Sequence, residues 1–329
     1  MKAIVCGAYG SPDVLRLQEV AKPVPKDDEV LVRVHAASVN ARDWRYMRAN
    51  PVFLRLMGGS FLRPKNPILG VDVAGRVEAV GTAVRQLRPG DEVFGYLSRY
   101  RGGTFAEYAC AGEDEVAVKP ANLSFEQAAA VPLAVCTALQ GLRDKGNLLP
   151  GQRVLVQGAS GGVGTFAVQI GKALGAEVTG VCSTRNLDLV RSIGADHVID
   201  YTKEDFTRRG TQYDLILAVN GYHPISDYLR SLTPEGVYVV AGGSMRQLFE
   251  AALQARRSPR VGSPKTHVVT LVHKQEDLVF LRGLLESGQV KPVIDGSYPL
   301  RRTAEALRYF EETHARGKVV ITVEADRER

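Results

Sequence analysis

The sequence predicts an α/β protein of two domains, one rich in β-strands and one built on a doubly wound parallel sheet. The first 120 residues contain short β-branched segments broken by Pro and Gly, a pattern typical of an all-β unit. From about residue 123 onward, helical segments alternate with compact apolar strands. Such alternation is typical of a parallel sheet covered on both faces. A length of 329 residues also favours two domains over one.

The expected elements follow from the turn residues that bound each apolar segment. In the β-rich part, the expected strands are residues 29–40, 73–81, 91–96 and 115–120. The later part is expected to supply strands at 153–158, 176–182, 197–201, 213–219 and 236–243, helices around 276–287 and 303–313, and a closing strand at 317–323.

Composition excludes several classes of protein. The chain has 45% hydrophobic and 24% charged residues and no apolar run of about 18 residues, so we expect no membrane span. Residues 1–10 are typical of a strand rather than of an export signal, which makes the cytoplasm the expected location. The cysteines are far apart and form neither a C-x-x-C pair nor a cluster with histidine: Cys6, Cys110, Cys136 and Cys182. We therefore expect free thiols and no metal site.

The charge of the chain is compatible with an anionic partner. The net charge is +6 and the pI is near 9.1, but the basic residues are dispersed and only residues 254–260 form a local cluster. A phosphorylated small ligand suits a positive field as well as a polynucleotide does. Nucleic-acid binding is therefore not the expected function.

The clearest functional motif is the turn after the first strand of the later part. That strand ends at Gly158, and residues 159–164 fit the fingerprint G-x-G-x-x-G with alanine in the first position. In this motif, Gly161 lets the backbone approach a pyrophosphate and Gly164 lets the helix pack closely on the strand. Free N–H groups at the helix start would face the anion. Because strand, turn and helix all surround the motif, we interpret it as a dinucleotide site rather than a tight turn alone.

The end of the next strand indicates which dinucleotide binds. An Asp or Glu about 20 residues past the glycines usually binds the adenosine ribose of NAD, whereas a nearby Arg accommodates the 2′-phosphate of NADP. This chain has the segment VCSTRN at 181–186, with Ser183 and Arg185 and no acid. A guanidinium offers paired donors and a fixed charge to a phosphate. We therefore predict NADPH; the alternative is that Arg185 only begins the next helix in solvent.

Three segments carry a resemblance to a known family. Residues 158–206, which begin GASGGVGTFAVQIGKALGA, resemble the cofactor domain of the medium-chain dehydrogenase/reductase superfamily. ILGVDVAGRVEAVG at 68–81 and HARGKVVITV at 314–323 resemble its other domain. Within the superfamily, the chain is most similar to the zinc-independent quinone oxidoreductase branch, which includes the chloroplast-envelope and reticulon-interacting types.

The resemblance implies a GroES-like, β-rich catalytic domain around a Rossmann cofactor domain, with the active site in the cleft. The GroES-like domain would span 1–122 and be completed by about 288–329, and the Rossmann NADPH-binding domain would span 123–287.

The resemblance also separates this chain from the zinc enzymes of the superfamily, which carry a catalytic cysteine, a Gly-His-Glu motif and a four-cysteine lobe. At these positions the chain has Asn40, GVD at 70–72, and a segment 97–110 in which Cys110 is the only cysteine. Without soft ligands there is no Lewis acid to polarise an alcohol oxygen. Hydride transfer then needs an acceptor that is already electrophilic, such as a quinone or an α,β-unsaturated carbonyl.

We therefore predict a zinc-independent NADPH-dependent oxidoreductase that reduces quinones by hydride transfer from nicotinamide. Two alternatives stay open. One is an NADPH-dependent enone or 2-alkenal double-bond reductase, and the other is an NADPH-binding interaction protein with little turnover.

The family pattern implies roles for individual residues. The pyrophosphate would lie against Ser160, Gly161, Gly162, Val163 and Gly164. The 2′-phosphate would be surrounded by Ser183, Arg185 and Tyr201, while Asn220 and Gly242 would border the adenine and nicotinamide sides. The nicotinamide and substrate cleft would be lined by Asn40, Asp43, Tyr46 and Thr137, with no catalytic role assigned to any of them.

Simpler roles are open for several segments. Tyr201 could only pack against its strand, and Asp43 could pair with Arg42 or Arg45 instead of contacting substrate. Residues 50–67 could form a substrate-covering loop or a packed surface loop. The β-rich stretch 266–272 resembles family strands that pair across a dimer axis, so we expect a homodimer.

Overall fold

The computed structural model describes residues 1–50, 63–97, 103–256 and 263–323. The chain forms two compact units. The first, called here the β-rich unit, comprises Met1–Leu133, His273–Glu286 and Pro292–Arg329. The second, called the parallel-sheet unit, comprises Ala134–Val272 and Ser287–Lys291.

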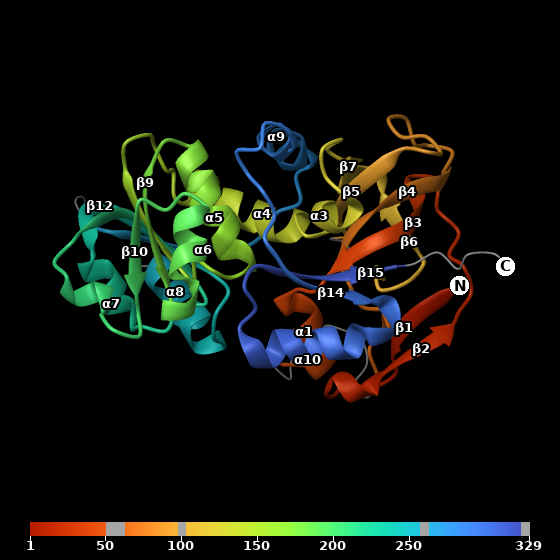
Figure 1. Ribbon diagram of the computed structural model, residues 1–329, viewed down its shortest axis with the longest axis horizontal. Helices are drawn as coiled ribbons and strands as arrows, with labels where there is room; N and C mark the ends of the chain where they lie inside the picture. Colours follow the sequence, from red (N-terminus) through yellow and green to blue (C-terminus); the bar gives the residue numbers. More distant parts are fainter. Residues whose placement is uncertain (51–62, 98–102, 257–262, 324–329) are drawn as a thin grey trace. The chain divides into compact units, whose positions relative to one another are not determined.

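One large sheet organises the β-rich unit (Figure 1). Its path runs through β14 (Ile294–Pro299), β15 (Lys318–Thr322), β3 (Glu29–Ser38), β4 (Asp72–Val80), β5 (Glu92–Tyr96) and β7 (Val116–Val118), and β6 (Tyr108–Gly112) pairs with β3. These neighbours are antiparallel except for the parallel pair β14 and β15. Strand β3 is central in this sheet, and eight of its ten residues are buried, including the polar Glu29 and Ser38.

Shorter elements complete this unit. Strands β1 (Lys2–Cys6) and β2 (Leu15–Glu19) form a separate antiparallel pair. The helices are α1 (Ala41–Arg48), α3 (Phe125–Ala129), α9 (Gln275–Glu286) and α10 (Thr303–Thr313). The core draws mainly on Val, Ala and Leu side chains from the strands, together with the buried face of α10.

The parallel-sheet unit contains six strands in one fully parallel sheet. Their order is β10 (His197–Asp200), β9 (Glu177–Cys182), β8 (Arg153–Gln157), β11 (Tyr213–Val219), β12 (Leu232–Ala241) and β13 (Lys265–Val268). The order reverses direction between β8 and β11, and this is the point at which doubly wound sheets bind ligands.

Helices cover both faces of this sheet. Helix α5 (Gly162–Ala173) packs on the side of Val154, and the π-helix Gln140–Lys145, which continues helix α4 (Pro132–Leu139), packs on the same side. Helix α6 (Leu187–Ser192) shares that side. Helices α7 (Ile225–Arg230) and α8 (Met245–Arg256) pack on the other, around Ile216 and Tyr238. This arrangement confirms the predicted doubly wound fold.

The structure refines several predicted bounds. Helices α3 and α9 lie in the β-rich unit, whereas the predicted domain limits placed 123–133 and 273–286 in the Rossmann domain. Strand β13 covers only residues 266–268 of the predicted β-rich stretch 266–272 and begins one residue before it. Within the described ranges, no helix combines the length and the apolar character needed to cross a membrane.

Candidate dinucleotide site and buried polar cluster

The glycine turn lies at the carboxyl end of β8, where a doubly wound sheet binds its ligand. Gly158 has a φ of 76°, and a Cβ there would lie 2.5 Å from the carbonyl oxygen of Val219. Helix α5 begins at Gly162, and its N-cap residue Gly161 has no side chain to occupy the first N–H groups. The helix start therefore presents backbone donors and a favourable dipole to an anion.

Gly164 is required by packing. A Cβ on this residue would lie 2.0 Å from the carbonyl oxygen of Gly158 and 2.8 Å from the Cα of Ala159. Any side chain would thus separate α5 from the end of β8. The other turn residues, Ser160, Gly161, Gly162 and Val163, are only partly buried and so remain accessible to a ligand.

Asn186 joins the two loops that carry the predicted phosphate-binding serines. Its side-chain amide donates to Ser160 Oγ at 2.9 Å and to Ser183 Oγ at 3.2 Å. The Asn186 side chain is buried, and its Oδ1 has no hydrogen-bond partner among the described residues. Sequence spacing did not single out Asn186, because a buried asparagine after a strand has no distinctive local signal.

The structure adds an acidic residue to this corner that the sequence interpretation does not include. The segment 181–186 contains no acid, but Asp200 at the end of the neighbouring strand β10 lies beside it. Asp200 accepts hydrogen bonds from the hydroxyls of Thr184 and Thr202, at 2.5 and 2.7 Å. The hydrogen bond from Thr184 is the main cause that lowers the pKa of Asp200, which keeps it anionic. This corner therefore holds one carboxylate whose oxygens are engaged by threonine hydroxyls.

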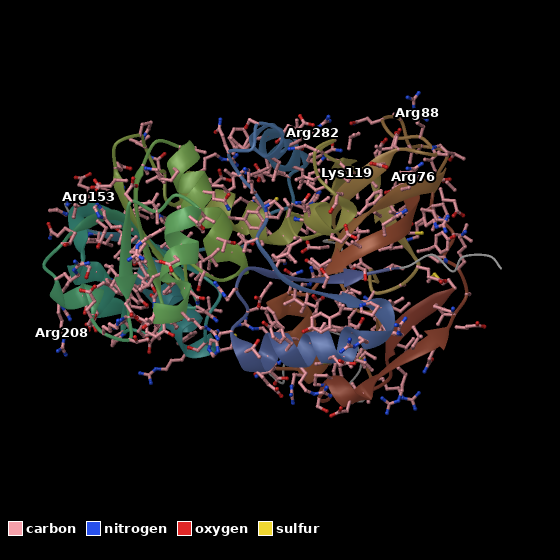
Figure 2. The ribbon with its side chains drawn as sticks, viewed as in Figure 1. Arg76, Arg88, Lys119, Arg153, Arg208 and Arg282 are labelled. Carbon is pink, nitrogen blue, oxygen red and sulfur yellow. The ribbon has the colours of Figure 1, made fainter. Side chains whose placement is uncertain are left out.

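Arg185 and Tyr201 are both exposed in this corner. Arg185 lies in the short 3-10 helix Thr184–Asn186. Tyr201 is 47% exposed, and its ring lies 5.8 Å from that of Tyr222, centroid to centroid. A hollow of about 420 Å³ beside these rings is also lined by Arg208, whose side chain extends away from the ribbon (Figure 2). Tyr201 therefore packs on another residue and still offers an exposed face.

Asn220 and Gly242 follow the carboxyl ends of β11 and β12. Both have left-handed backbones, with φ of 62° and 81°, and both are exposed. The predicted dinucleotide residues after β8, β9, β11 and β12 thus all lie at the same edge of one sheet, because parallel strands end together.

The predicted cleft residue Asn40 belongs to a buried cluster in the β-rich unit. Its side-chain nitrogen donates to Asp72 Oδ2 at 2.9 Å and to the Ser38 carbonyl at 3.2 Å. Its Oδ1 accepts from Lys318 Nζ at 2.5 Å. Asn40 is only 5% exposed, so the protein itself uses the hydrogen-bonding capacity of this amide.

Asp72 and Lys318 form a buried ion pair in the same cluster. Lys318 Nζ lies 3.3 Å from Asp72 Oδ2, and the side chains are 4% and 0% exposed. Asp72 also accepts from Ser38 Oγ at 2.6 Å and from the Leu133 amide at 2.9 Å. By the family resemblance, position 72 lies where the zinc enzymes carry the Gly-His-Glu motif. In this chain it holds a carboxylate that pairs with Lys318 and accepts from a hydroxyl and an amide.

Asp43 caps helix α1. Its carboxylate accepts the backbone N–H of Asn40 at 2.9 Å and that of Gly70 at 3.2 Å. Complete burial raises the pKa of Asp43 to about 7. The sequence predicts either a contact with substrate or a pairing with arginine for Asp43, and the structure shows a further role as the helix cap.

The two remaining cleft candidates lie in different units. Tyr46, in α1, is partly buried, and its ring packs edge-on against Tyr9 with centroids 6.3 Å apart. Its hydroxyl accepts a long hydrogen bond of 3.5 Å from the amide of Asn66. Thr137 is partly buried in α4 and belongs to the parallel-sheet unit.

Soft metal ligands are scarce around the cluster. No group of three or more His, Cys, Asp or Glu side chains suited to a metal is found within the described ranges. Asn40, Asp72 and Lys318 supply an amide, a paired carboxylate and an ammonium, which do not fit a zinc ion that prefers thiolate and imidazole.

Two predicted features lie largely outside the described residues. The loop 50–67 includes 51–62, and the basic cluster 254–260 includes 257–260. The possible substrate-covering loop therefore stays a prediction, and so does the expectation that nucleic acid is not the partner of the basic cluster.

A dinucleotide-type parallel sheet and a GroES-like sheet together define the class, the medium-chain dehydrogenase/reductase superfamily. Residues 26–121 match the family model "Alcohol dehydrogenase GroES-like domain", and residues 193–321 match the model "Zinc-binding dehydrogenase". The chain belongs to this superfamily and, within it, to the branch of the quinone oxidoreductase homologues. It is therefore an oxidoreductase.

Particular relatives cover nearly the whole chain. An Arabidopsis thaliana protein named NADPH-dependent alkenal/one oxidoreductase, chloroplastic, is 36% identical over 98% of this chain and 79% of its own length. The chloroplast envelope quinone oxidoreductase homolog of the same plant is 34% identical over 98% of both chains. Among solved structures, the quinone oxidoreductase from Coxiella burnetii has a TM-score of 0.87 and 30% identity, covering 98% of this chain and 99% of that one.

Proposed function

We propose that this protein is a zinc-independent, NADPH-dependent oxidoreductase that reduces quinones. The observation that carries the proposal is the corner after β9, where Asn186 holds the hydroxyls of Ser160 and Ser183 beside the exposed Arg185. These groups fit a phosphorylated dinucleotide, because hydroxyl donors and a guanidinium suit a 2′-phosphate. When bound, NADPH would supply a hydride from its nicotinamide ring.

The protein's own residues would bind and orient this cofactor. The uncapped start of α5, with Ser160 to Val163 before and within it, would hold the pyrophosphate. Arg185 and Tyr201 would face the 2′-phosphate, and Asn220 and Gly242 would border the two rings. Asp200 is an acid in this corner, and an acid here is typical of NAD binding. Its oxygens, however, accept hydrogen bonds from threonine hydroxyls, and Lys203 Nζ lies 3.7 Å from Asp200 Oδ2.

The buried cluster supports the absence of catalytic zinc. The name of one matching family model includes zinc, yet the amide of Asn40 is fully used by Ser38, Asp72 and Lys318. Without a Lewis acid, the acceptor has to be electrophilic by conjugation. That requirement favours a quinone or an enone over a simple ketone.

The choice of quinone follows the naming of several relatives as quinone oxidoreductases. An alkenal or enone acceptor is the second candidate, supported by the name of the alkenal/one oxidoreductase. An NADPH-binding interaction protein with little turnover is the third. A homodimer formed through the edge strand β13 and a cytoplasmic location complete the proposal.

The test compares initial rates of NADPH and NADH oxidation with a simple quinone and, in parallel, an alkenal. The proteins are the wild type, Arg185→Ala and the control Arg191→Ala, whose arginine pairs with Asp188 within the next helix. We expect quinone turnover with an NADPH preference. Arg185→Ala should raise the KM for NADPH by about tenfold or more, with NADH unchanged, and Arg191→Ala should resemble the wild type.

Each other outcome selects a different function. Equal use of both dinucleotides by the wild type would show that Arg185 does not read a phosphate. Turnover with the alkenal alone would make the protein an enone reductase. Tight NADPH binding without turnover would favour an NADPH-binding interaction protein. One zinc ion per chain in the purified protein would instead favour a zinc-dependent alcohol dehydrogenase.

A further inference from the structure

Four polar side chains form a buried cluster beneath the loops at the carboxyl edge of the parallel sheet. They are Gln157, Tyr228, Tyr238 and Gln247, and each is 6% exposed or less. We propose that this cluster positions the dinucleotide-binding loops and that Tyr228 is its central positioning residue. The inference rests on the proposed dinucleotide function and assigns part of that site to residues that do not touch the ligand.

Tyr228 connects two strand ends through its hydroxyl. The hydroxyl donates to Oε1 of Gln157, the last residue of β8, immediately before Gly158. It accepts the backbone N–H groups of Tyr222 and His223 at 3.1 and 3.3 Å. One side chain of α7 thus holds the loop after β11 against the residue that opens the glycine turn.

Gln247 extends the connection to the loop after β12. Its Nε2 donates to the hydroxyl of Tyr238 at 3.3 Å. A Cβ on Gly221 would lie 2.4 Å from Gln247 Nε2 and 2.8 Å from the Tyr228 hydroxyl. A Cβ on Gly243 would lie 2.8 Å from Gln247 Oε1. Both glycine loops therefore run directly against the cluster.

These loops carry the residues proposed to border the cofactor rings. Gly221 follows Asn220, and Gly243 follows Gly242. Asn220 is a non-glycine residue with a left-handed φ of 62°, a conformation that needs support from its surroundings. The hydrogen bonds that the Tyr228 hydroxyl accepts from Tyr222 and His223 supply that support two and three residues further on.

The composition of the cluster argues for positioning rather than for stability alone. Gln157 Nε2 and Gln247 Oε1 are buried and have no hydrogen-bond partner within the described ranges. Such groups lower stability, and apolar side chains would fill the same space without that loss. Burial also raises the pKa of Tyr228, so its hydroxyl keeps its proton and can donate and accept at once.

The test is direct binding of NADPH and of NADH to Tyr228→Phe, by calorimetry or nucleotide fluorescence, together with steady-state kinetics. The matched control is Tyr213→Phe, a buried tyrosine at the amino end of β11 and outside this cluster. We expect Tyr228→Phe to raise the Kd for both dinucleotides by about tenfold. The kcat should stay within about twofold, because the variant loosens loops without removing a group that meets substrate.

Comparing the affinities for NADPH and NADH separates this positioning role from recognition of the 2′-phosphate. The loops border the rings, so both affinities should fall by the same factor in Tyr228→Phe, whereas Arg185→Ala should weaken NADPH alone. Unchanged affinity relative to Tyr213→Phe, or a loss confined to NADPH, would overturn the inference while the proposed function stands. A wild type that binds neither dinucleotide would overturn both.

A second variant covers the case in which Tyr228→Phe does not fold. Gln247→Met keeps the length of the side chain but removes the amide between Gly221 and Gly243. We expect the same parallel loss of NADPH and NADH affinity, with circular dichroism used to establish folding. Wild-type affinity for both dinucleotides in folded Gln247→Met would contradict the inference.

Discussion

At the scale of single residues, the carboxyl group of Asp43 combines full burial with a structural task. It accepts two backbone N–H groups, from Asn40 and Gly70, and so caps helix α1 and holds the segment before β4. Burial raises its pKa to about 7, because a charge in an apolar interior is poorly solvated. The residue is therefore coupled to pH through folding, independently of any contact with substrate.

This shift predicts the direction of a pH effect on stability. An aspartate in the unfolded chain has a pKa of about 3.9. Because the folded value is higher, about 7, the contribution of Asp43 to the free energy of unfolding is complete below about pH 4 and is lost as the pH rises toward 7. We expect the wild type to lose stability relative to Asp43→Asn over this range, measured by urea unfolding at a series of pH values.

Asp196 provides a control of opposite sign. Burial alone would raise its pKa, but hydrogen bonds from Lys172 and from the Val178 amide lower it. The stability that Asp196 contributes is therefore present at neutral pH and lost in acid. A pH-independent difference between the wild type and Asp43→Asn would show that Asp43 has an ordinary pKa in the folded protein.

At the scale of elements, the ion pair of Lys318 and Asp72 joins β15 and β4 across the strand β3 that lies between them. Removing one partner leaves an uncompensated charge in the interior. We expect Lys318→Met to lower the free energy of unfolding by about 3–5 kcal/mol. The double variant Lys318→Met with Asp72→Leu should recover part of that loss, because it removes both charges.

The surface pair Lys22 and Glu78 is the control for this prediction. Their side chains are 40% and 39% exposed, and an exposed pair contributes about 1 kcal/mol or less. Urea unfolding of Lys22→Met should therefore differ little from that of the wild type. A loss in Lys318→Met of about 1 kcal/mol or less, the size expected for the exposed pair, would mean that the buried pair is not needed for stability.

At the scale of the whole molecule, the parallel sheet ends in an edge strand. Strand β13 pairs with β12 on one side and lies last in the strand order. An unprotected edge invites pairing with another strand, and a twofold axis would satisfy it with an identical one. We expect light scattering to give twice the mass of one chain.

A charge at this edge should disrupt the dimer. Strand β13 has only four residues, so any antiparallel pairing across the axis brings the two copies of position 267 close together. His267→Glu would place like charges there and should shift the mass toward one chain. The control Val118→Glu lies in β7, at one edge of the large sheet of the β-rich unit, and should leave the mass unchanged. A single-chain mass for the wild type would refute the dimer.

Much of the fold could be predicted because its signals are local. Continuous apolar strands, the glycine turn and the alternation of helix and strand predicted the parallel sheet, and β8, β9, β10 and β11 lie within a residue of their expected bounds. Unit boundaries were less predictable: α3 and α9 have the same local pattern as Rossmann helices but pack with the β-rich unit. Which unit a helix belongs to depends on the side chains it packs against, and local periodicity does not specify them.

The sequence by itself determined the chemistry available at each position: glycines where a side chain would collide, serines and an arginine after the second parallel strand, and asparagine where zinc enzymes have cysteine. Only the tertiary structure decided how these groups are used. In the folded protein, Asp200 accepts a hydrogen bond from Thr184, Asn40 accepts one from Lys318, and Tyr228 lies beneath the loop after β11. The physical reason is that hydrogen bonds between distant segments depend on which strands lie side by side, and sequence spacing carries no direct record of that order.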